Sequence, residues 1–297
     1  MRLTALTQSH IVLIMNSPDS MIASPIAHPK VDRLAAFFDA FQLSVRVLPE
    51  AEVSHASALY VLSGSRATAE SIVLAIRAGG ASPANTLVAA SVDFGSTNNP
   101  LMNAMPDDFS MRVDDSQALR DTTNAFLAEA SGVRCGRSRA LDRLGEVIVL
   151  MALRSAIEGR ATEPGLLAGL GHPDLHRVLV AIHEAPARTW DIAELAEIAG
   201  MSRSRFMALF PKVVGITPMV YVNRWRLQFG RRELQKGAKV KAVARHAGFA
   251  SAEAFSRAYS REFGRAPIAD LRLGGSADAS SPATLQKQRI QLGSRGS

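Results

Sequence analysis

The stretch IAELAEIAGMSRSRFMALFPK at residues 192–212 joins two short helical periodicities through a glycine. Ala196 is small enough for a second helix to cross the first at that point. Gly200, four residues later, tolerates the positive φ that a tight turn between helices requires. Ser202 is a favourable N-cap for the helix after the turn. These residue types at this spacing predict a helix-turn-helix unit.

The same pattern recurs at residues 240–264, VKAVARHAGFASAEAFSRAYSREFG. The offset is 48 residues up to the turn and 49 beyond it, because the second turn is one residue longer. The matching pairs are Ala196 and Ala244, Ala199 and Ala247, Gly200 and Gly248, Met201 and Phe249, Phe206 and Phe255, Phe210 and Tyr259, and Gly215 and Gly264. One alanine–glycine pattern also fits any three-helix domain with a glycine turn, but its repetition predicts two helix-turn-helix units.

A single helix over residues 217–235 is expected to join the two units. Pro218 suits its first turn, whereas Gly230 costs the helix roughly 1 kcal/mol relative to alanine. Its apolar face comprises Tyr221, Val222, Trp225 and Phe229. The remaining face carries Arg224, Arg226, Arg231 and Arg232, and it is either a solvated surface or a contact for phosphate. A rigid linker of suitable length would hold two recognition helices ~34 Å apart, one turn of B-DNA.

Charge is unevenly distributed along the 297 residues, whose formal net charge is +7. Residues 31–135 hold 12 acidic and 7 basic side chains, whereas residues 187–273 hold 16 basic and 7 acidic ones. The basic surplus falls on the predicted helix-turn-helix units, so this part of the chain is expected to meet phosphate.

Two features bear on the compartment. The longest uninterrupted apolar run, residues 147–153, is far shorter than the roughly 18 residues of a membrane span, and residues 1–15 lack a signal-peptide pattern. The one cysteine, Cys135, fits a reducing compartment. We therefore expect a cytoplasmic protein without a membrane partner.

The residues before 159 are predicted to mix α and β structure. An amphipathic helix is expected at 31–43, and its apolar face comprises Leu34, Phe37, Phe38 and Phe41. Four β-favouring runs follow at residues 44–48, 58–62, 71–76 and 86–94. Short strands at this spacing indicate a small antiparallel sheet or partial barrel. After Pro106 the pattern turns helical, with helices expected at 117–130 and 139–158.

The helix expected at 139–158 carries an a/d-like seam at three- and four-residue spacings. The seam consists of Leu141, Leu144, Ile148, Met151 and Ser155. Such a stripe either packs on its own domain or forms the contact of a dimer, and the sequence leaves both interpretations open.

These patterns predict an α+β fold class and five segments. Residues 1–30 are expected to be poorly ordered, 31–158 to form the sheet with its helices, and 159–171, rich in glycine, to be a flexible linker. Residues 172–273 are expected to be all-α, and 274–297 a disordered tail.

Several motifs in the helical region match a known family at fixed spacing. They are Gly200-Met-Ser-Arg-Ser-Arg-Phe206, Gly215-Ile-Thr-Pro218, Tyr221, Trp225-Arg226, Ala247-Gly-Phe-Ala-Ser251, and Phe255 to Gly264 followed by Pro267. From about His172 to Arg272 the chain resembles the AraC/XylS family of transcription regulators. The resemblance implies sequence-specific binding to double-stranded DNA, with the two recognition helices in successive major grooves.

The upstream residues resemble AraC-type regulators with a cupin-type N-terminal domain. The matching features are Val31 to Phe41, the short strands, Asn99-Pro-Leu-Met102, Pro106-Asp107 and Leu141 to Glu146. This implies a partial cupin-like barrel that serves dimerisation or the sensing of a small-molecule effector. Metal-binding cupins use several histidines with a glutamate, but His55 is the only histidine between Val31 and Leu119, so no metal or other cofactor is expected.

The resemblance places base contacts on the exposed faces of the two recognition helices. The matching positions are Ser204, Met207 and Ala208 in the first, and Ala252, Glu253, Ser256 and Arg257 in the second. Arg257 is the strongest candidate, because a bidentate arginine–guanine contact is the commonest specific one. Candidates for phosphate contacts are Arg203, Arg205, Lys212, Arg226 and Arg261, and each is also a plausible surface ion-pair partner.

The first unit departs from the family pattern. Basic residues are usual near Ala208 and Pro211, and both positions are uncharged here. A proline inside a helix costs roughly 3 kcal/mol, so the first recognition helix is expected to kink or end at Pro211. The second unit is therefore predicted to carry more of the specificity.

Three functions of different classes are compatible with these features. The first is a regulator of promoter DNA that acts as a homodimer and contacts RNA polymerase. The second is an architectural protein that binds DNA through charge alone. The third is a cupin-type enzyme with an attached DNA-binding domain, against which the missing ligand cluster argues. We expect the first, without enzymatic activity.

Overall fold

The computed structural model describes residues 32–47, 57–65, 68–77, 82–95, 99–159 and 163–271. The described residues from Arg33 onward belong to one compact unit. The segments 1–30 and 274–297, which we expected to be poorly ordered, lie outside the described residues, as does His55.

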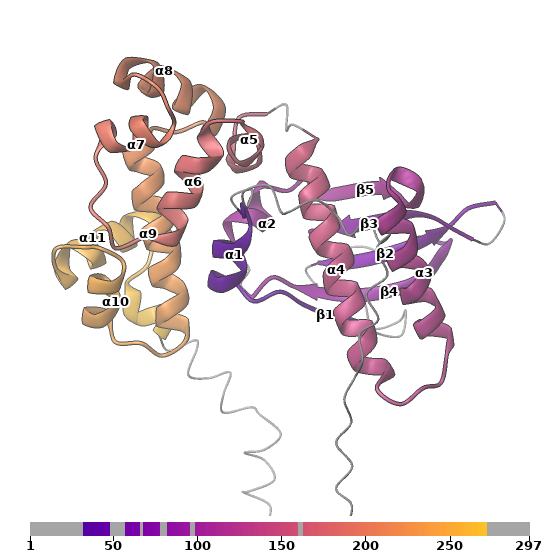
Figure 1. Ribbon diagram of the computed structural model, residues 1–297. Coiled ribbons are helices and arrows are strands. Elements are labelled where there is room, and N and C mark those ends of the chain that lie inside the picture. Colours follow the sequence, from indigo (N-terminus) through magenta and orange to yellow (C-terminus); the bar gives the residue numbers. More distant parts are fainter. Residues whose placement is uncertain are drawn as a thin grey trace, which may run out of the picture. The chain divides into compact units, whose positions relative to one another are not determined.

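A five-stranded antiparallel sheet organises the N-terminal half (Figure 1). Its strands are β1 (Ser44–Val47), β2 (Ala58–Ser63), β3 (Ala69–Ala75), β4 (Thr86–Asp93) and β5 (Asp108–Arg112), in the order β1-β4-β2-β3-β5. Each neighbouring pair is antiparallel. The expected small antiparallel sheet is confirmed, and the first four strands lie where the turn residues predicted them.

Strand β5 was not predicted, because the chain after Pro106 was expected to be helical. β5 is an edge strand, and its pattern alternates with only Phe109 and Met111 as apolar residues. Met111 is buried, whereas the flanking Ser110 and Arg112 are exposed. A pattern with two apolar positions is too short to signal a strand on its own. A short helix, α2 (Pro100–Ala104), precedes it and buries Leu101 and Met102.

Two long helices, α3 (Gln117–Ser131) and α4 (Arg137–Glu158), cover one face of the sheet (Figure 1). Gly145 lets α4 lie close to β1, since a Cβ there would be 2.6 Å from Cγ1 of Val45. The a/d-like seam of α4 faces this core: Leu141 and Ile148 are buried, and Leu144 and Met151 are partly buried against it. The interpretation that the stripe packs on its own domain is the one that the structure supports.

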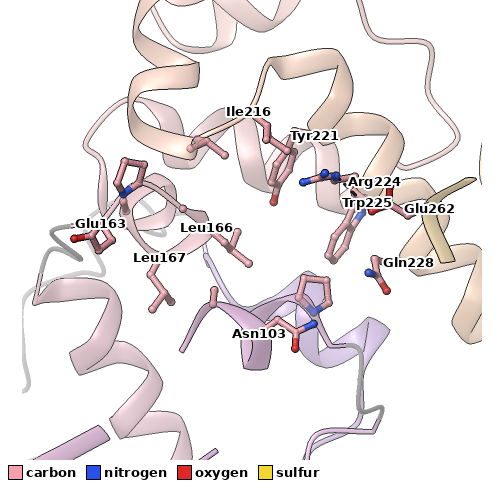
Figure 2. A pocket seen from close by; sticks show the side chains of 16 residues that line it. Asn103, Glu163, Leu166, Leu167, Ile216, Tyr221, Arg224, Trp225, Gln228 and Glu262 are labelled. Atoms are coloured by element: carbon pink, nitrogen blue, oxygen red, sulfur yellow. Dashed lines mark ion pairs between the residues drawn. The ribbon is translucent and has the colours of Figure 1, made fainter. Parts of the chain in front are cut away.

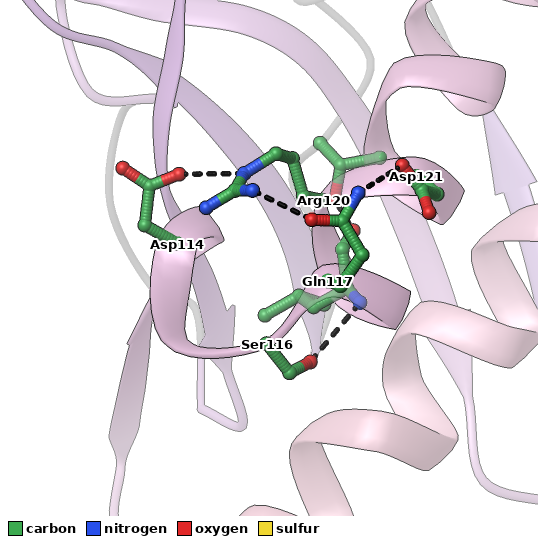
Figure 3. A network of polar contacts seen from close by, with 7 residues as sticks. Asp114, Ser116, Gln117, Arg120 and Asp121 are labelled. Carbon is green, nitrogen blue, oxygen red and sulfur yellow. Dashed lines mark hydrogen bonds and ion pairs between the residues drawn. The ribbon is translucent and has the colours of Figure 1, made fainter.

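A polar network fixes the start of α3 (Figure 3). The hydroxyl of Ser116 accepts a hydrogen bond from the backbone N–H of Leu119 at 3.1 Å. Arg120 donates from Nε to Asp114 at 2.9 Å and from Nη1 to Gln117 at 2.7 Å. An N-cap and an ion pair in the first turn therefore direct α3 onto the sheet.

Within the segment expected to be a flexible linker, α5 (Leu166–Gly171) forms a helix that buries Leu166, Leu167 and Leu170. Gly169 allows it to approach the next helix, α6 (Leu175–Glu184), because a Cβ there would be 2.7 Å from Cδ1 of Leu179. The glycine that suggested flexibility instead permits close packing, and the linker interpretation fails for these residues.

The first helix, α1 (Ala35–Ala40), is shorter than the 31–43 expected, but Leu34, Phe37 and Phe41 are buried as predicted. The ring of Phe37 lies 4.6 Å from that of His183 on α6 and 5.0 Å from that of Trp225 on α9 (Pro218–Gln235). The apolar face of α1 thus packs on the helical region.

Candidate nucleic-acid interface

The first predicted unit consists of α7 (Ile192–Ile198) and α8 (Arg203–Val214). Gly200 adopts a φ of 65° in the turn, as required. Its N–H donates to the carbonyl of Glu197 at 2.8 Å, and the N–H of Met201 donates to that of Ala196 at 3.0 Å. Ser202 caps α8 by accepting from the N–H of Arg205.

The second unit consists of α10 (Val240–His246) and α11 (Ala252–Phe263) and repeats this arrangement. Gly248 has a φ of 74°. Its N–H donates to the carbonyl of Arg245 at 3.0 Å, and the N–H of Phe249 donates to that of Ala244 at 2.9 Å. Ser251 caps α11 by accepting from the N–H of Ala254. The hydrogen bonds of the two turns are equivalent, which confirms the predicted pair of helix-turn-helix units.

Helix α8 continues through Pro211 to Val214, so of the two predicted outcomes the end of the helix at the proline is wrong, and the kink stays a prediction. Around it, Phe206, Phe210 and Val214 are buried in the core. Their packing offsets the missing backbone hydrogen bond, because tertiary contacts of an apolar face contribute more to helix stability than local propensity does.

The predicted base-contact residues lie on equivalent faces of α8 and α11. On α8, Ser204, Met207 and Ala208 are exposed, and 40% of Met207 is accessible. On α11, Glu253 and Arg257 are exposed, and Ala252 and Ser256 are partly buried. With the 49-residue offset, the pairs are Ser204 and Glu253, Met207 and Ser256, and Ala208 and Arg257. In each helix these positions follow i, i+3, i+4 spacing and share one side.

The surroundings of Glu253 on this face favour its ionised form. Its pKa is lowered chiefly by the hydrogen bond with the Ser251 side chain and by a backbone hydrogen bond within Glu253, while Arg257 and Lys241 lower it further. An ionised carboxylate is a hydrogen-bond acceptor only.

Most of the predicted phosphate contacts are exposed cations. They are Arg203, Arg205, Lys212 and Arg261. Neither these four nor Arg257 form an ion pair with another described residue. Their charges are therefore not neutralised by the described part of the chain.

Arg226 differs from the other predicted phosphate contacts. Its Nε donates to the carbonyl of Pro186 at 2.8 Å and its Nη2 to that of Arg188 at 2.7 Å. Burial lowers its pKa. Two of its three nitrogen atoms thus tie α9 to the loop before α7, and the predicted phosphate contact remains a prediction.

Arg231 was predicted on a solvated or phosphate-facing surface, but it is only 8% exposed, so that prediction is wrong. Its Nε lies 3.5 Å from the fully buried carboxylate of Asp270, and its guanidinium stacks on Phe263 at 4.7 Å. Asp270 also pairs with Arg265 at 2.6 Å and accepts a hydrogen bond from the hydroxyl of Tyr259. No local sequence signal marks Asp270, because its partners are brought to it by the fold.

Neither a membrane span nor a metal centre is found among the described residues. No single helix there is long and apolar enough to cross a membrane. Helices α8 and α9 taken together have the length and composition of a span, but the chain bends by 52° between them. In the same part of the chain, no group of three His, Cys, Asp or Glu side chains could hold a metal ion.

Two family models match the chain. The model of a helix-turn-helix domain matches residues 195–272, and the model of a cupin domain matches residues 32–158. The transcriptional regulator AlkR of Acinetobacter baylyi is 30% identical over 174 residues, 57% of each chain. A putative AraC-like transcription regulator of Streptomyces antibioticus is 38% identical over 129 residues, 42% of each chain. The chain thus spans about half the length of the curated relatives it matches.

A crystal structure of a probable AraC family transcriptional regulator from Rhodopseudomonas palustris is also similar. It is 30% identical, covers 33% of this chain and 94% of its own, and has a TM-score of 0.31. With a TM-score this low, the structural similarity adds nothing to the two family matches.

Proposed function

We propose that the chain is a sequence-specific DNA-binding transcription regulator of the AraC type, because a helix-turn-helix domain model and a cupin domain model match it and AraC-like regulators are among its relatives. The observation that carries the proposal is the duplicated unit. Helices α8 and α11 begin at equivalent serine caps and present equivalent exposed faces. Two such helices on one rigid linker suit two successive major grooves.

The two recognition helices would read bases differently. On α11, Arg257 is suited to guanine O6 and N7, and the carboxylate of Glu253 to the amino group of cytosine. Ser256 can donate to a base or a phosphate. On α8, Met207 and Ala208 can make apolar contact with thymine methyl groups, which discriminates less than a bidentate hydrogen bond. We therefore assign most of the specificity to the second unit.

The exposed cations around these faces would hold the DNA backbone. Arg203, Arg205, Lys212 and Arg261 flank the base-reading positions and lack ion-pair partners among the described residues. Phosphate contacts of this kind fix register and orientation, and they make affinity fall with salt.

We assign DNA binding to residues 172–273, and dimerisation and effector sensing to residues 31–158. Val147 on α4 is 40% exposed, and a dimer contact would cover this apolar side chain. As a regulator of promoters, the protein would act in the cytoplasm and contact RNA polymerase. The relatives named above are transcription regulators, which favours this role over that of a cupin-type enzyme.

The test is a mobility-shift assay of the full chain with DNA flanking its own gene, at about 150 mM salt with excess competitor DNA. A discrete complex that survives the competitor supports a specific regulator. A complex that the competitor removes would instead support the architectural alternative, in which charge alone binds DNA.

Two variants test how specificity is divided. Arg257→Ala is expected to weaken specific binding about 10- to 100-fold and to change competitor binding little. Arg203→Ala should weaken both kinds of binding equally and reduce the salt slope by about 1. Arg154→Ala, an exposed arginine on α4, is the matched control and should change neither. Equal losses of specific binding in the first two variants would refute the assignment to the second unit.

A further inference from the structure

A cavity of about 490 Å³ lies between α2, α5 and α9, away from the candidate base contacts (Figure 2). Its walls are largely apolar and packed in place: Leu166, Leu167, Tyr221 and Trp225 all line it and are each at most 9% exposed. A volume of this size falls within the range of ligand pockets, which combine apolar walls with a few polar groups.

The polar groups stand at opposite ends of the cavity. Figure 2 shows Glu163 at one end and Gln228 and Glu262 at the other, with the leucines of α5 between them. Nε of Arg224 is 3.4 Å from Oε1 of Glu262, so these two charges neutralise each other. Glu163 forms no ion pair with another described residue.

The lining therefore holds two carboxylates and one guanidinium, which leaves a net negative charge at the Glu163 end. A ligand carboxylate would be repelled there, and an ammonium group attracted. The hydroxyl of Tyr221 already bonds Nε2 of His183, at 2.6 Å, so Tyr221 offers the cavity mainly its ring. Together with Trp225 it adds aromatic surface, which favours a cation further.

We propose that this cavity binds a small organic cation, with its apolar body along Leu166 and Leu167 and its ammonium group at Glu163. The occupant would touch α2, which belongs to the sheet domain, and α9, which joins the two helix-turn-helix units. Binding would therefore change the affinity for DNA. The change in DNA affinity rests on the proposed function, whereas binding of the cation to the cavity does not.

Calorimetric titration of the full chain with three matched probes tests the class of ligand. The probes are 1-naphthylmethylamine, 1-naphthalenemethanol and 1-naphthoate, which share a ring system and differ in the charge of the head group. The amine should bind about tenfold more tightly than the alcohol, and the carboxylate most weakly. Tightest binding of the carboxylate, or no binding of the amine at millimolar concentration, would overturn the proposal.

Variants locate the site. Glu163→Gln, an exposed position, should weaken the amine about tenfold and leave the alcohol unchanged. Ala104→Trp fills the cavity from α2 and should remove binding of every probe. Ala125→Trp on the exposed side of α3 is its control and should bind like the unmodified chain. Unchanged amine binding in Glu163→Gln or in Ala104→Trp would show that the cation binds elsewhere.

The effect of the cation on DNA affinity is measured separately from its binding to the cavity. In the mobility-shift assay, the amine should change the DNA affinity of the unmodified chain at least threefold and leave that of Ala104→Trp unchanged. If calorimetry shows amine binding but the chain binds no DNA specifically, the cation site stands and the proposed function fails. If DNA binding is specific but the amine does not bind, the cation site is refuted and the proposed function stands.

Discussion

Replacing Gly248 with alanine should destabilise the chain more than replacing Gly200, although the two glycines occupy equivalent turns. Both have a positive φ, 74° and 65°, where a side chain costs ~1–2 kcal/mol. A Cβ on Gly248 would lie 2.9 Å from Cα and O of Ala187 and 3.0 Å from O of Pro186, all of them backbone atoms. A Cβ on Gly200 would have Nη2 of Arg177 as its nearest neighbour, at 3.7 Å.

The difference in free energy follows from these distances. Ordinary carbon–carbon contact begins at about 3.5 Å, so alanine at position 248 requires a backbone shift of about 0.6 Å. Overpacking of this kind costs ~1–3 kcal/mol. Gly248→Ala should therefore cost ~2–5 kcal/mol and Gly200→Ala ~1–2 kcal/mol. The smaller entropy of the unfolded alanine chain offsets part of each loss, and it cancels in the comparison.

Urea unfolding, followed by the fluorescence of Trp190 and Trp225, measures both losses. Both tryptophans are buried in the helical region that contains the turns. The prediction is an extra loss of ~1–3 kcal/mol for Gly248→Ala, with the urea dependence unchanged in both variants. Equal losses of unfolding free energy would refute the reasoning. They would show that the positive φ alone determines the cost at both positions and that the backbone around Ala187 shifts without a cost in free energy.

Three further perturbations test other parts of the fold. Asp270→Asn should cost ~3–5 kcal/mol in urea unfolding, because it leaves the buried Arg231 without its counter-charge; a loss below 1 kcal/mol would contradict this. Gly230→Ala should destabilise despite alanine's ~1 kcal/mol helix advantage, since a Cβ would lie 2.8 Å from Cε2 of Phe255; increased stability would rule out the close approach. Burial lowers the pKa of His183 from 6.5 to about 3, so the unfolded chain binds the extra proton between these values. Stability should then fall as the pH drops through this window, by at most ~1.4 kcal/mol per pH unit, and His183→Gln should make the fall shallower.

The features that could be predicted from the sequence are those that neighbouring residues determine. A glycine such as Gly200 and a serine such as Ser202 specify a turn and a cap through their own backbone and side-chain chemistry, so both turns and the first cap were located to the residue. Strands between turn residues were found for the same reason.

The features that could not be predicted depend on partners distant in sequence. Asp270 lies 39 residues after Arg231 in the sequence. Nothing near either residue indicates that the two side chains pair in the core. The sequence around Gly230 shows only its cost to the helix, because Phe255, which lies against it, is distant in sequence. Pro211 was overestimated as a helix breaker, because its cost is local whereas the packing that offsets it is not.

The relation between the two units depends on the loop at residues 186–188. The turn of the second unit, at Gly248, packs against the backbone of Ala187, and Arg226 of α9 donates to the carbonyls on either side of it. The loop leads directly into α7, so the first unit, the linking helix and the second turn meet at one segment of backbone. The orientation of α8 relative to α11 is thus set there and not by α9 alone. A change in this loop should alter the spacing of half-sites that the protein accepts and leave the base contacts within each half-site intact.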